Sequence, residues 1–215
     1  MEITGPVWFL GVDAAVEAVF FLISLLVAIT AIRAYRLLHD VRYKTLSWGF
    51  GMLSVSYLVL AVANAIVATK LRVGITAPFL EERLEAILSI GIILYCALFL
   101  MGLLALLILY YDVRDMWLRT TLVALVLCNL VLAGYHTTAF YILTAILLGS
   151  IVLRLWRQGA YRKRWMVQTG FSLLFIGEIF LGILFLTPLL YVAAHVIALA
   201  GFSLILASNL RALRR

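Results

Sequence analysis

The sequence predicts an all-α integral membrane protein, a seven-transmembrane-helix bundle with its N-terminus outside and its C-terminus cytoplasmic. The first observation is composition: 66% of the 215 residues are hydrophobic and 13% are charged, whereas soluble domains are about 45–50% apolar and about 25% charged. The second is a series of seven long apolar runs, and the third is the concentration of Lys and Arg in alternate connections between them. Because so much apolar surface has to face lipid, we expect a multi-pass protein of the cell membrane.

Each apolar run is long enough to cross a bilayer as a helix, which takes roughly 20 residues. Backbone polar groups must be paired within such a segment, and these runs are longer and more uniformly apolar than the alternating strands of a β-barrel. We expect one membrane domain, residues 1–215. The predicted spans are about 8–32, 46–69, 85–111, 116–134, 138–156, 166–187 and 189–210.

Lys and Arg set the predicted orientation, because cytoplasmic connections carry an excess of these residues. On one side of the predicted bundle lie 14 of the 17, and only Lys70, Arg72 and Arg83 lie on the other. These three belong to the one sizeable external loop, about 70–84, in which Pro78 suits the start of a short surface helix. The basic inner face includes Arg33, Arg36, Arg154, Arg157, Arg162, Lys163 and Arg164.

The net charge of +7 does not indicate nucleic-acid binding, because the basic residues lie in short loops between apolar runs. In that position they contact anionic lipid headgroups. The expected partners are therefore the lipid bilayer, a small external ligand and a cytoplasmic or membrane protein. Cys96 and Cys128 lie inside apolar runs without metal or redox spacing and are interpreted as small apolar residues.

Two parts of the chain align with each other without a gap. RAYR at 33–36 then falls on RLWR at 154–157, and GF at 49–50 falls on GF at 170–171. The alignment predicts a three-helix unit that is repeated in the same orientation after one linker helix, as in some transporters. The alternative is coincidence, because apolar sequence aligns with itself easily and basic residues recur at every inner end.

Ionisable residues within a span are costly and therefore mark candidate functional positions. At their predicted heights Asp13, Glu17, Glu178 and His195 all fall in the outer half of the bundle, while the inner half is almost purely apolar. This asymmetry predicts a polar cavity that is open to the outside and closed below. The predicted ligand-binding residues are Glu17, Glu178, His195, Asp13, Asn64, Asn129 and Tyr95.

Glu178 and His195 are predicted to lie within about one helical turn of each other in height, because a very short turn joins their helices. A Glu–His pair would allow both to be buried, either in a binding site or as a structural link between packed helices. Asp13 and Glu17 lie four residues apart on one helix face, and contact with headgroups is the alternative for them, above all for Asp13. His136, in an external turn, is interpreted as solvated.

No pattern in the sequence indicates an enzyme or a cofactor. The acidic and histidine residues suit a divalent metal by type but lack the spacing of a metal motif. His195 is the only histidine clearly inside a span, which argues against haem, and no lysine lies in the last span to bind retinal. No nucleophile–base pair stands out either. The metal candidates considered are Asp13, Glu17, His136, Glu178 and His195.

Three stretches in the first half share features with a class of membrane sensors. The first helix ends in AIRAYRLL (31–38), the second begins with SWGFGMLSVSYLVLA (47–61), and the third ends in LILYYDVR (107–114). This pattern resembles the seven-helix sensor regions found N-terminal to some microbial histidine kinases. The resemblance implies an external stimulus or ligand and, since no kinase domain follows Arg215, a separate cytoplasmic partner.

These observations favour a receptor-like or sensory protein whose external cavity binds a small ligand, ion or proton. A small-solute transporter with a 3+1+3 helix repeat is the first alternative, and it requires a true repeat and a pathway that opens inward. An accessory membrane subunit of a larger complex is the second alternative. In that case the polar residues only pack against partners.

Overall fold

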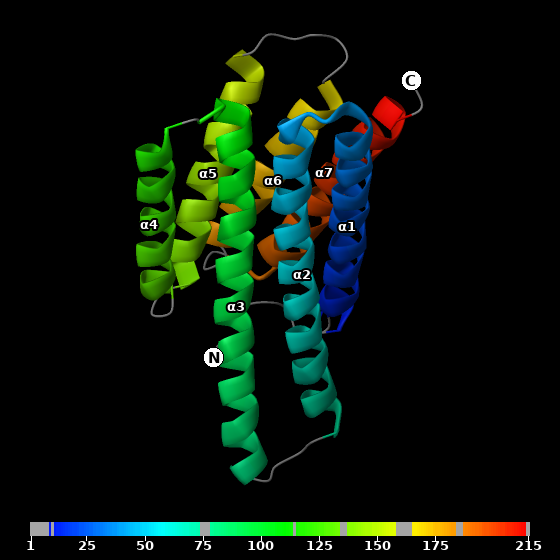
Figure 1. Cartoon of the computed structure of the whole chain (residues 1–215). Helices are drawn as coiled ribbons and strands as arrows, with labels where there is room; N and C mark the ends of the chain where they lie inside the picture. The colour runs from blue at the N-terminus through cyan, green and yellow to red at the C-terminus, as the bar shows by residue number, and fades with distance from the viewer. Residues whose placement is uncertain are drawn as a thin grey trace.

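The computed structural model of the chain describes residues 9, 11–73, 78–113, 115–133, 137–157, 165–183 and 187–213. This part of the chain forms seven α-helices (Figure 1). The helical bundle that the sequence predicts is therefore confirmed. The helices are α1 (Val12–Leu38), α2 (Val41–Val73), α3 (Pro78–Tyr111), α4 (Met116–Ala133), α5 (Thr137–Arg157), α6 (Trp165–Gly182) and α7 (Leu189–Leu213).

Six of these helices contain a segment long and apolar enough to cross a membrane. The exception within the described part of the chain is α4, whose apolar stretch covers Met116–Cys128. The chain therefore has the structure of a multi-pass membrane protein, and its seventh span and its orientation stay predictions. The six segments are Val12–Leu38, Val41–Thr69, Leu88–Tyr111, Ala139–Arg157, Trp165–Gly182 and Leu189–Arg211.

The predicted external loop at about 70–84 is wrong. Helix replaces most of it, since α2 continues to Val73 and α3 already begins at Pro78. Proline suits the first position of a helix, where its missing N–H would have no partner, and Pro78 therefore opens the long α3 rather than a separate surface helix. Figure 1 shows α2 and α3 projecting beyond the other helices at this end of the bundle.

The start of α2 also lies earlier than the sequence predicts, at Val41. The side chain of Asp40 accepts a hydrogen bond of 2.9 Å from the backbone N–H of Arg42. A carboxylate in this position stabilises the first turn of a helix by pairing one of its free N–H groups. The helix can therefore begin among polar residues, before the apolar segment that marks the span.

The helices form a ring around the centre of the bundle. Neighbours in sequence pack side by side from α1 to α3 and from α5 to α7, and the ring closes where α1 packs against α7 and α3 against α5. α4 lies outside this ring, against α3 and α5 (Figure 1). The bundle thus has a first half, α1–α3, and a second half, α5–α7, with α4 between them in sequence.

Helix α1 has a buried inner face and an exposed outer face, and both faces are apolar. Val27 is fully buried, whereas its neighbour Leu26 is 48% exposed. On the inner face the Ser47 hydroxyl of α2 donates a hydrogen bond of 2.9 Å to the Ala28 carbonyl oxygen. Small hydroxyl residues of this kind allow helices to pack closely in lipid.

Two helix pairs approach each other closely at glycines. Between α2 and α3, a Cβ atom on Gly102 would lie 2.9 Å from the carbonyl oxygen of Gly49. Between α6 and α7, a Cβ atom on Gly201 would lie 2.8 Å from the carbonyl oxygen of Gly170. Any larger residue would have to push the backbones apart, so glycine permits these two helix contacts.

The side chains around the two glycine contacts also match. A leucine of the earlier helix covers the second glycine in each pair, Leu53 in α2 and Leu174 in α6. An aliphatic residue of the later helix covers the first glycine, Leu106 in α3 and Ile205 in α7. Matching residues of α2 and α6 are 121 positions apart, and those of α3 and α7 are 99 positions apart.

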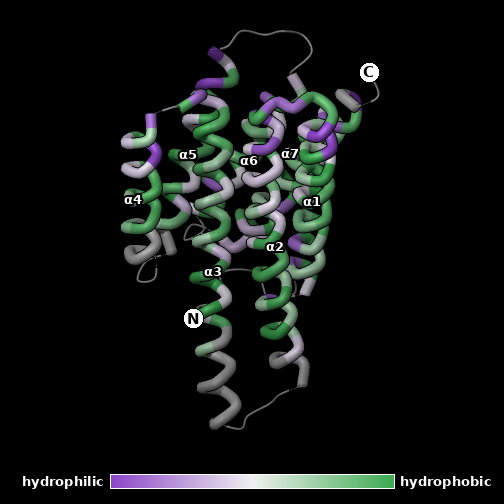
Figure 2. Tube along the Cα trace, in the orientation of Figure 1, coloured by the Kyte–Doolittle hydropathy of each residue, from purple (hydrophilic) through white to green (hydrophobic). Residues whose placement is uncertain are grey.

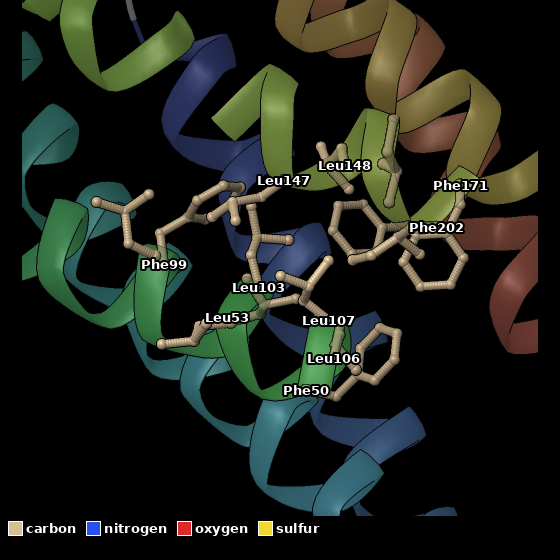
Figure 3. Packing of buried hydrophobic residues seen from close by; sticks show 14 of the residues in the cluster. Phe50, Leu53, Phe99, Leu103, Leu106, Leu107, Leu147, Leu148, Phe171 and Phe202 are labelled. Atoms are coloured by element: carbon tan, nitrogen blue, oxygen red, sulfur yellow. The ribbon is translucent and has the colours of Figure 1, made fainter. Parts of the chain in front are cut away.

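Polar and apolar residues divide along the bundle axis. Figure 2 shows hydrophilic residues at the end where α1 finishes and α2 begins, with largely apolar helices below them. Figure 3 shows aromatic and aliphatic side chains of several helices, such as Phe50, Leu106 and Phe171, packed together in the core. We call the end with Arg33, Arg36, Arg154 and Arg157 the basic end, and the end where α1 begins the opposite end.

Candidate ligand-binding cavity

A cavity of about 410 Å³ lies inside the ring of helices. All six ring helices contribute to its wall, and none of its described lining residues comes from α4. Its ionisable lining residues Glu17, Glu178 and His195 lie four to six residues from the ends of their helices at the opposite end. Toward the basic end the wall is apolar and includes Phe50 and Phe171, each 1% exposed. The volume is within the usual range for small-molecule sites, about 300–1,000 Å³.

Glu17 of α1 is the centre of a polar cluster in this wall, and its side chain is only 1% exposed. The side-chain amide of Asn64, on α2, donates to both carboxyl oxygens over 2.8 and 2.9 Å. The Nε2 atom of His195, on α7, lies 4.0 Å from Oε1. Three helices thus bring together a carboxyl, an amide and an imidazole, each of which would be costly to bury alone.

The ring of His195 is held in one orientation by its own helix. Its Nδ1 atom lies 2.8 Å from the carbonyl oxygen of Tyr191, one turn earlier in α7. A carbonyl oxygen only accepts, so Nδ1 carries a hydrogen and Nε2 is left to face Glu17. The Nε2 atom of the imidazole therefore points toward the Glu17 carboxyl across a gap of 4.0 Å.

The ion-pair partner of His195 is Glu17 and not the predicted Glu178, although His195 is close enough to Glu178 to act on it electrostatically. Sequence gives the height of a residue along its helix but not the rotation of that helix. Because α1 packs against α7 in the ring, Glu17 reaches the imidazole. Glu178 instead turns toward α5.

Glu178 of α6 faces the hydroxyl group of Thr144, on α5. The hydroxyl donates to the Glu178 Oε2 atom over 2.8 Å and lies 2.9 Å from the Tyr141 carbonyl oxygen. One hydroxyl hydrogen can satisfy only one of these two acceptors at a time. Glu178 is 8% exposed and lines the cavity, so its carboxyl group has a neutral partner and an open side.

Aromatic rings connect the two polar positions around the cavity wall. Phe20 of α1 stacks near His195, with ring centroids 6.2 Å apart, and packs on Tyr57 of α2 at 5.1 Å. From Tyr57 the chain of rings continues through Tyr95 on α3 to Phe140 on α5, with centroids 6.4 and 5.6 Å apart. Tyr95, a predicted binding residue, thus belongs to this wall.

The sequence analysis misses Tyr57, which lines the cavity, and Thr144, which contacts the cavity residue Glu178. Thr144 carries the Glu178 contact, while Tyr57 lines the cavity at 7% exposure and its hydroxyl has no hydrogen bond to a described residue. Neutral side chains are inexpensive inside a span, so hydropathy does not mark them. The one available signal was the repeat alignment, which places Tyr57 opposite Glu178 at the same offset as the glycines.

Of the remaining predicted polar residues, Asp13 does not line the described cavity. Asp13 is buried at 4% exposure, but its carboxyl group accepts hydrogen bonds of 2.8 Å from the backbone N–H groups of Gly11 and Ala14. It therefore caps the start of its own helix and is not among the described lining residues. The side chain of Asn129 and the whole of His136 lie outside the described part of the chain.

At the basic end one arginine, Arg154, is partly buried, and the other described arginines are exposed. The Arg154 guanidinium donates to the Tyr110 carbonyl oxygen over 3.3 Å and lies 5.6 Å from the centre of the Tyr111 ring. Arg33, Arg36 and Arg157 are exposed. The predicted members Arg162, Lys163 and Arg164 lie outside the described residues.

Within the described part of the chain, no three His, Cys, Asp or Glu side chains come together in a group that could hold a metal ion. Cys96 lines the cavity and Cys128 is exposed, and both thiols are free. No protein-family model matches this chain, and no curated protein or solved structure matches it. The interpretation of the cavity therefore depends on its own geometry and chemistry.

Proposed function

We propose that this chain is a receptor-like membrane protein that binds a small ligand in the central cavity. The observation that carries the proposal is the convergence of Glu17, Asn64, His195 and Glu178 on one cavity of about 410 Å³. An apolar, aromatic wall with a few convergent polar groups is the usual composition of a small-molecule site. Polar groups that face a cavity within the membrane are candidates for function by default.

The distribution of charge supports access from outside. The polar lining residues lie toward the opposite end, while the basic end carries the arginines that favour a cytoplasmic location. In this orientation the ligand enters from outside, and the wall around Phe50 and Phe171 closes the cavity on the cytoplasmic side. The exposed arginines then contact lipid headgroups or a cytoplasmic partner that responds to ligand binding.

Native mass spectrometry of the protein, extracted gently from its own membrane, tests the binding proposal. We expect a small molecule at one-to-one stoichiometry. Ala198 lines the cavity, so Ala198→Phe fills it and should remove the added mass. Ala124→Phe places the same side chain on the exposed surface of α4 and should retain it. Absence of any added mass from the unmodified protein and from the Ala124→Phe variant would contradict the proposal. A chain found only with other subunits would favour the accessory-subunit alternative.

A transporter is the second candidate, and the matching glycine contacts favour it. The same offsets of 121 and 99 positions relate pairs of cavity-lining residues in the two halves. We interpret this as an internal three-helix repeat, with the cavity between its two copies, as in transporters built from parallel repeats. The pairs include Phe50 and Phe171, Leu53 and Leu174, Tyr57 and Glu178, Cys96 and His195, and Leu103 and Phe202.

Uptake into proteoliposomes separates these two candidates. The compound identified by mass spectrometry would be labelled and presented to sealed vesicles that contain the protein, the Ala198→Phe variant or no protein. A transporter gives time-dependent accumulation that only the unmodified protein shows. Saturable binding without accumulation supports the receptor-like function.

A further inference from the structure

We propose that the ligand of this cavity is a hydrophobic organic cation, such as an aliphatic or aromatic amine or a quaternary ammonium compound. The inference rests on the proposed binding function and adds the chemical class of the ligand. Three features of the cavity carry it: an excess of carboxyl groups, a wall of aromatic rings, and a tyrosine hydroxyl group in that wall that has no hydrogen bond to a described residue.

The charged groups of the cavity do not balance. Two carboxyl groups, Glu17 and Glu178, line it, and its described lining contains no Lys or Arg. The imidazole of His195 can offset one carboxylate, and it faces Glu17 at 4.0 Å. Glu178 accepts its hydrogen bond from the neutral Thr144 hydroxyl, and the one described imidazole that acts on it electrostatically is His195, which it shares with Glu17. A carboxylate in a low-dielectric interior is costly without a positive partner, and a monocationic ligand would supply that partner.

The aromatic wall of the cavity suits a ligand that carries a positive charge and is otherwise apolar. Phe20, Tyr57, Tyr95 and Phe140 form a continuous arc of rings from α1 to α5, with neighbouring centroids 5.1 to 6.4 Å apart. Faces of aromatic rings attract ammonium groups, and cages of such rings recognise quaternary ammonium ligands. The same rings contribute apolar contact area for the rest of the molecule.

Tyr57 supplies a polar group that is free to meet the ligand. Its side chain is 7% exposed, and its hydroxyl makes no hydrogen bond to any described residue. The equivalent position in the second half of the bundle is Glu178, which also lines the cavity. The two halves therefore present a hydroxyl on one side and a carboxyl on the other, so a cation drawn to Glu178 can place a polar substituent near Tyr57.

Radioligand binding with three benzyl compounds that differ in charge tests the inference on the full chain in nanodiscs. The labelled probe is benzyltrimethylammonium. Its competitors are neopentylbenzene, which has carbon in place of nitrogen, and phenylacetate, which carries a negative charge. We expect saturable binding that unlabelled cation displaces and the other two do not. Glu178→Gln should weaken binding roughly ten- to hundred-fold, the range for losing a contact to a charged group.

Asp40→Asn is the matched control, because it removes a carboxyl at the basic end, outside the cavity lining, and should leave binding unchanged. Equal competition by neopentylbenzene would overturn the cationic class while leaving the cavity a binding site. Binding of the probe that is unchanged in the Glu178→Gln variant would likewise overturn the cationic class. A cavity that yields a bound mass by native mass spectrometry but takes up no cation overturns only this inference. A cavity empty in both experiments overturns the proposed function as well.

Discussion

Glu17 depends on two neighbours from different helices, and this dependence decides what a substitution costs. The amide of Asn64 donates to both carboxyl oxygens, while His195 approaches one of them from the other side. A buried group that loses its donor has no water to replace it, so the loss is larger than the net contribution of an ordinary hydrogen bond. The cost of changing Asn64 should therefore depend on the charge of residue 17.

A double-mutant cycle measures this coupling. Asn64→Ala should destabilise the protein by roughly 1–3 kcal/mol, because it leaves a buried carboxyl with fewer donors. In a Glu17→Gln background the same substitution should cost clearly less, because a neutral amide needs less stabilisation. Thermal unfolding of the four proteins in detergent gives the interaction free energy. Simple additivity of the two substitutions would mean that the contact contributes nothing specific.

The sequence predicts how far along its helix each ionisable residue lies, but it does not predict which residue each one contacts. Glu17, Glu178 and His195 were predicted to lie near one end, and all three line the cavity. Their pairing depends on how far each helix is rotated about its axis, which hydropathy does not determine when both helix faces are apolar. Tyr57 and Thr144 escaped notice for a different reason, namely that a neutral side chain can be buried in a span without an evident cost.

The helix pairs α2–α3 and α6–α7 owe their close packing to backbone contact at glycines. A Cβ atom at Gly102 would meet a backbone oxygen at 2.9 Å, and one at Gly201 would meet another at 2.8 Å. Helices in lipid associate through packing and not through burial from water. Loss of close contact therefore removes much of what holds each pair together.

Gly102→Ala and Gly201→Ala should each destabilise the protein by roughly 1–3 kcal/mol, the usual effect of forcing an extra methyl group into a filled space. Gly51→Ala is the internal control, since a Cβ at Gly51 has no atom within 4 Å. This control should leave stability unchanged or raise it by up to about 1 kcal/mol through better helix propensity. Thermal unfolding in one detergent ranks the three variants, and equal midpoints would rule out the glycine contacts as stabilising features.

The helices themselves were predictable wherever the apolar runs were long, and their ends were not. Hydropathy marks the part of a helix that lies in lipid, but a helix can continue into water. α2 and α3 extend past their apolar segments at the opposite end, where the residues before Leu88 are helical. α4 extends over Met116–Ala133, its described apolar part is Met116–Cys128, and its crossing of the membrane stays a prediction.

At the scale of the whole molecule, the ring gives the cavity its position between two halves. Each half contributes three consecutive helices, and the halves meet where α1 packs on α7 and α3 on α5. Exchanging the halves exchanges these two interfaces, so the arrangement is close to a two-fold symmetric one. The polar residues break this symmetry, since Glu178 and His195 in the second half correspond to Tyr57 and Cys96 in the first.

Orientation of the ring in the membrane decides which side supplies the ligand. We predict that the basic end faces the cytoplasm, because arginines in short connections are retained inside. Two exposed positions allow a test: Asp40 at the basic end and Thr187, between α6 and α7, at the opposite end. Native Cys96 and Cys128 would first be replaced by alanine.

In this background, Thr187→Cys should react with a membrane-impermeant maleimide on intact cells, whereas Asp40→Cys should react only after the cells are permeabilised. A reporter of correct folding, such as a monodisperse elution profile, accompanies each variant. The reverse labelling pattern would place the basic end outside and turn the polar half of the cavity toward the cytoplasm. The ligand would then have to come from inside the cell, and a receptor for external compounds would be the wrong function for this bundle.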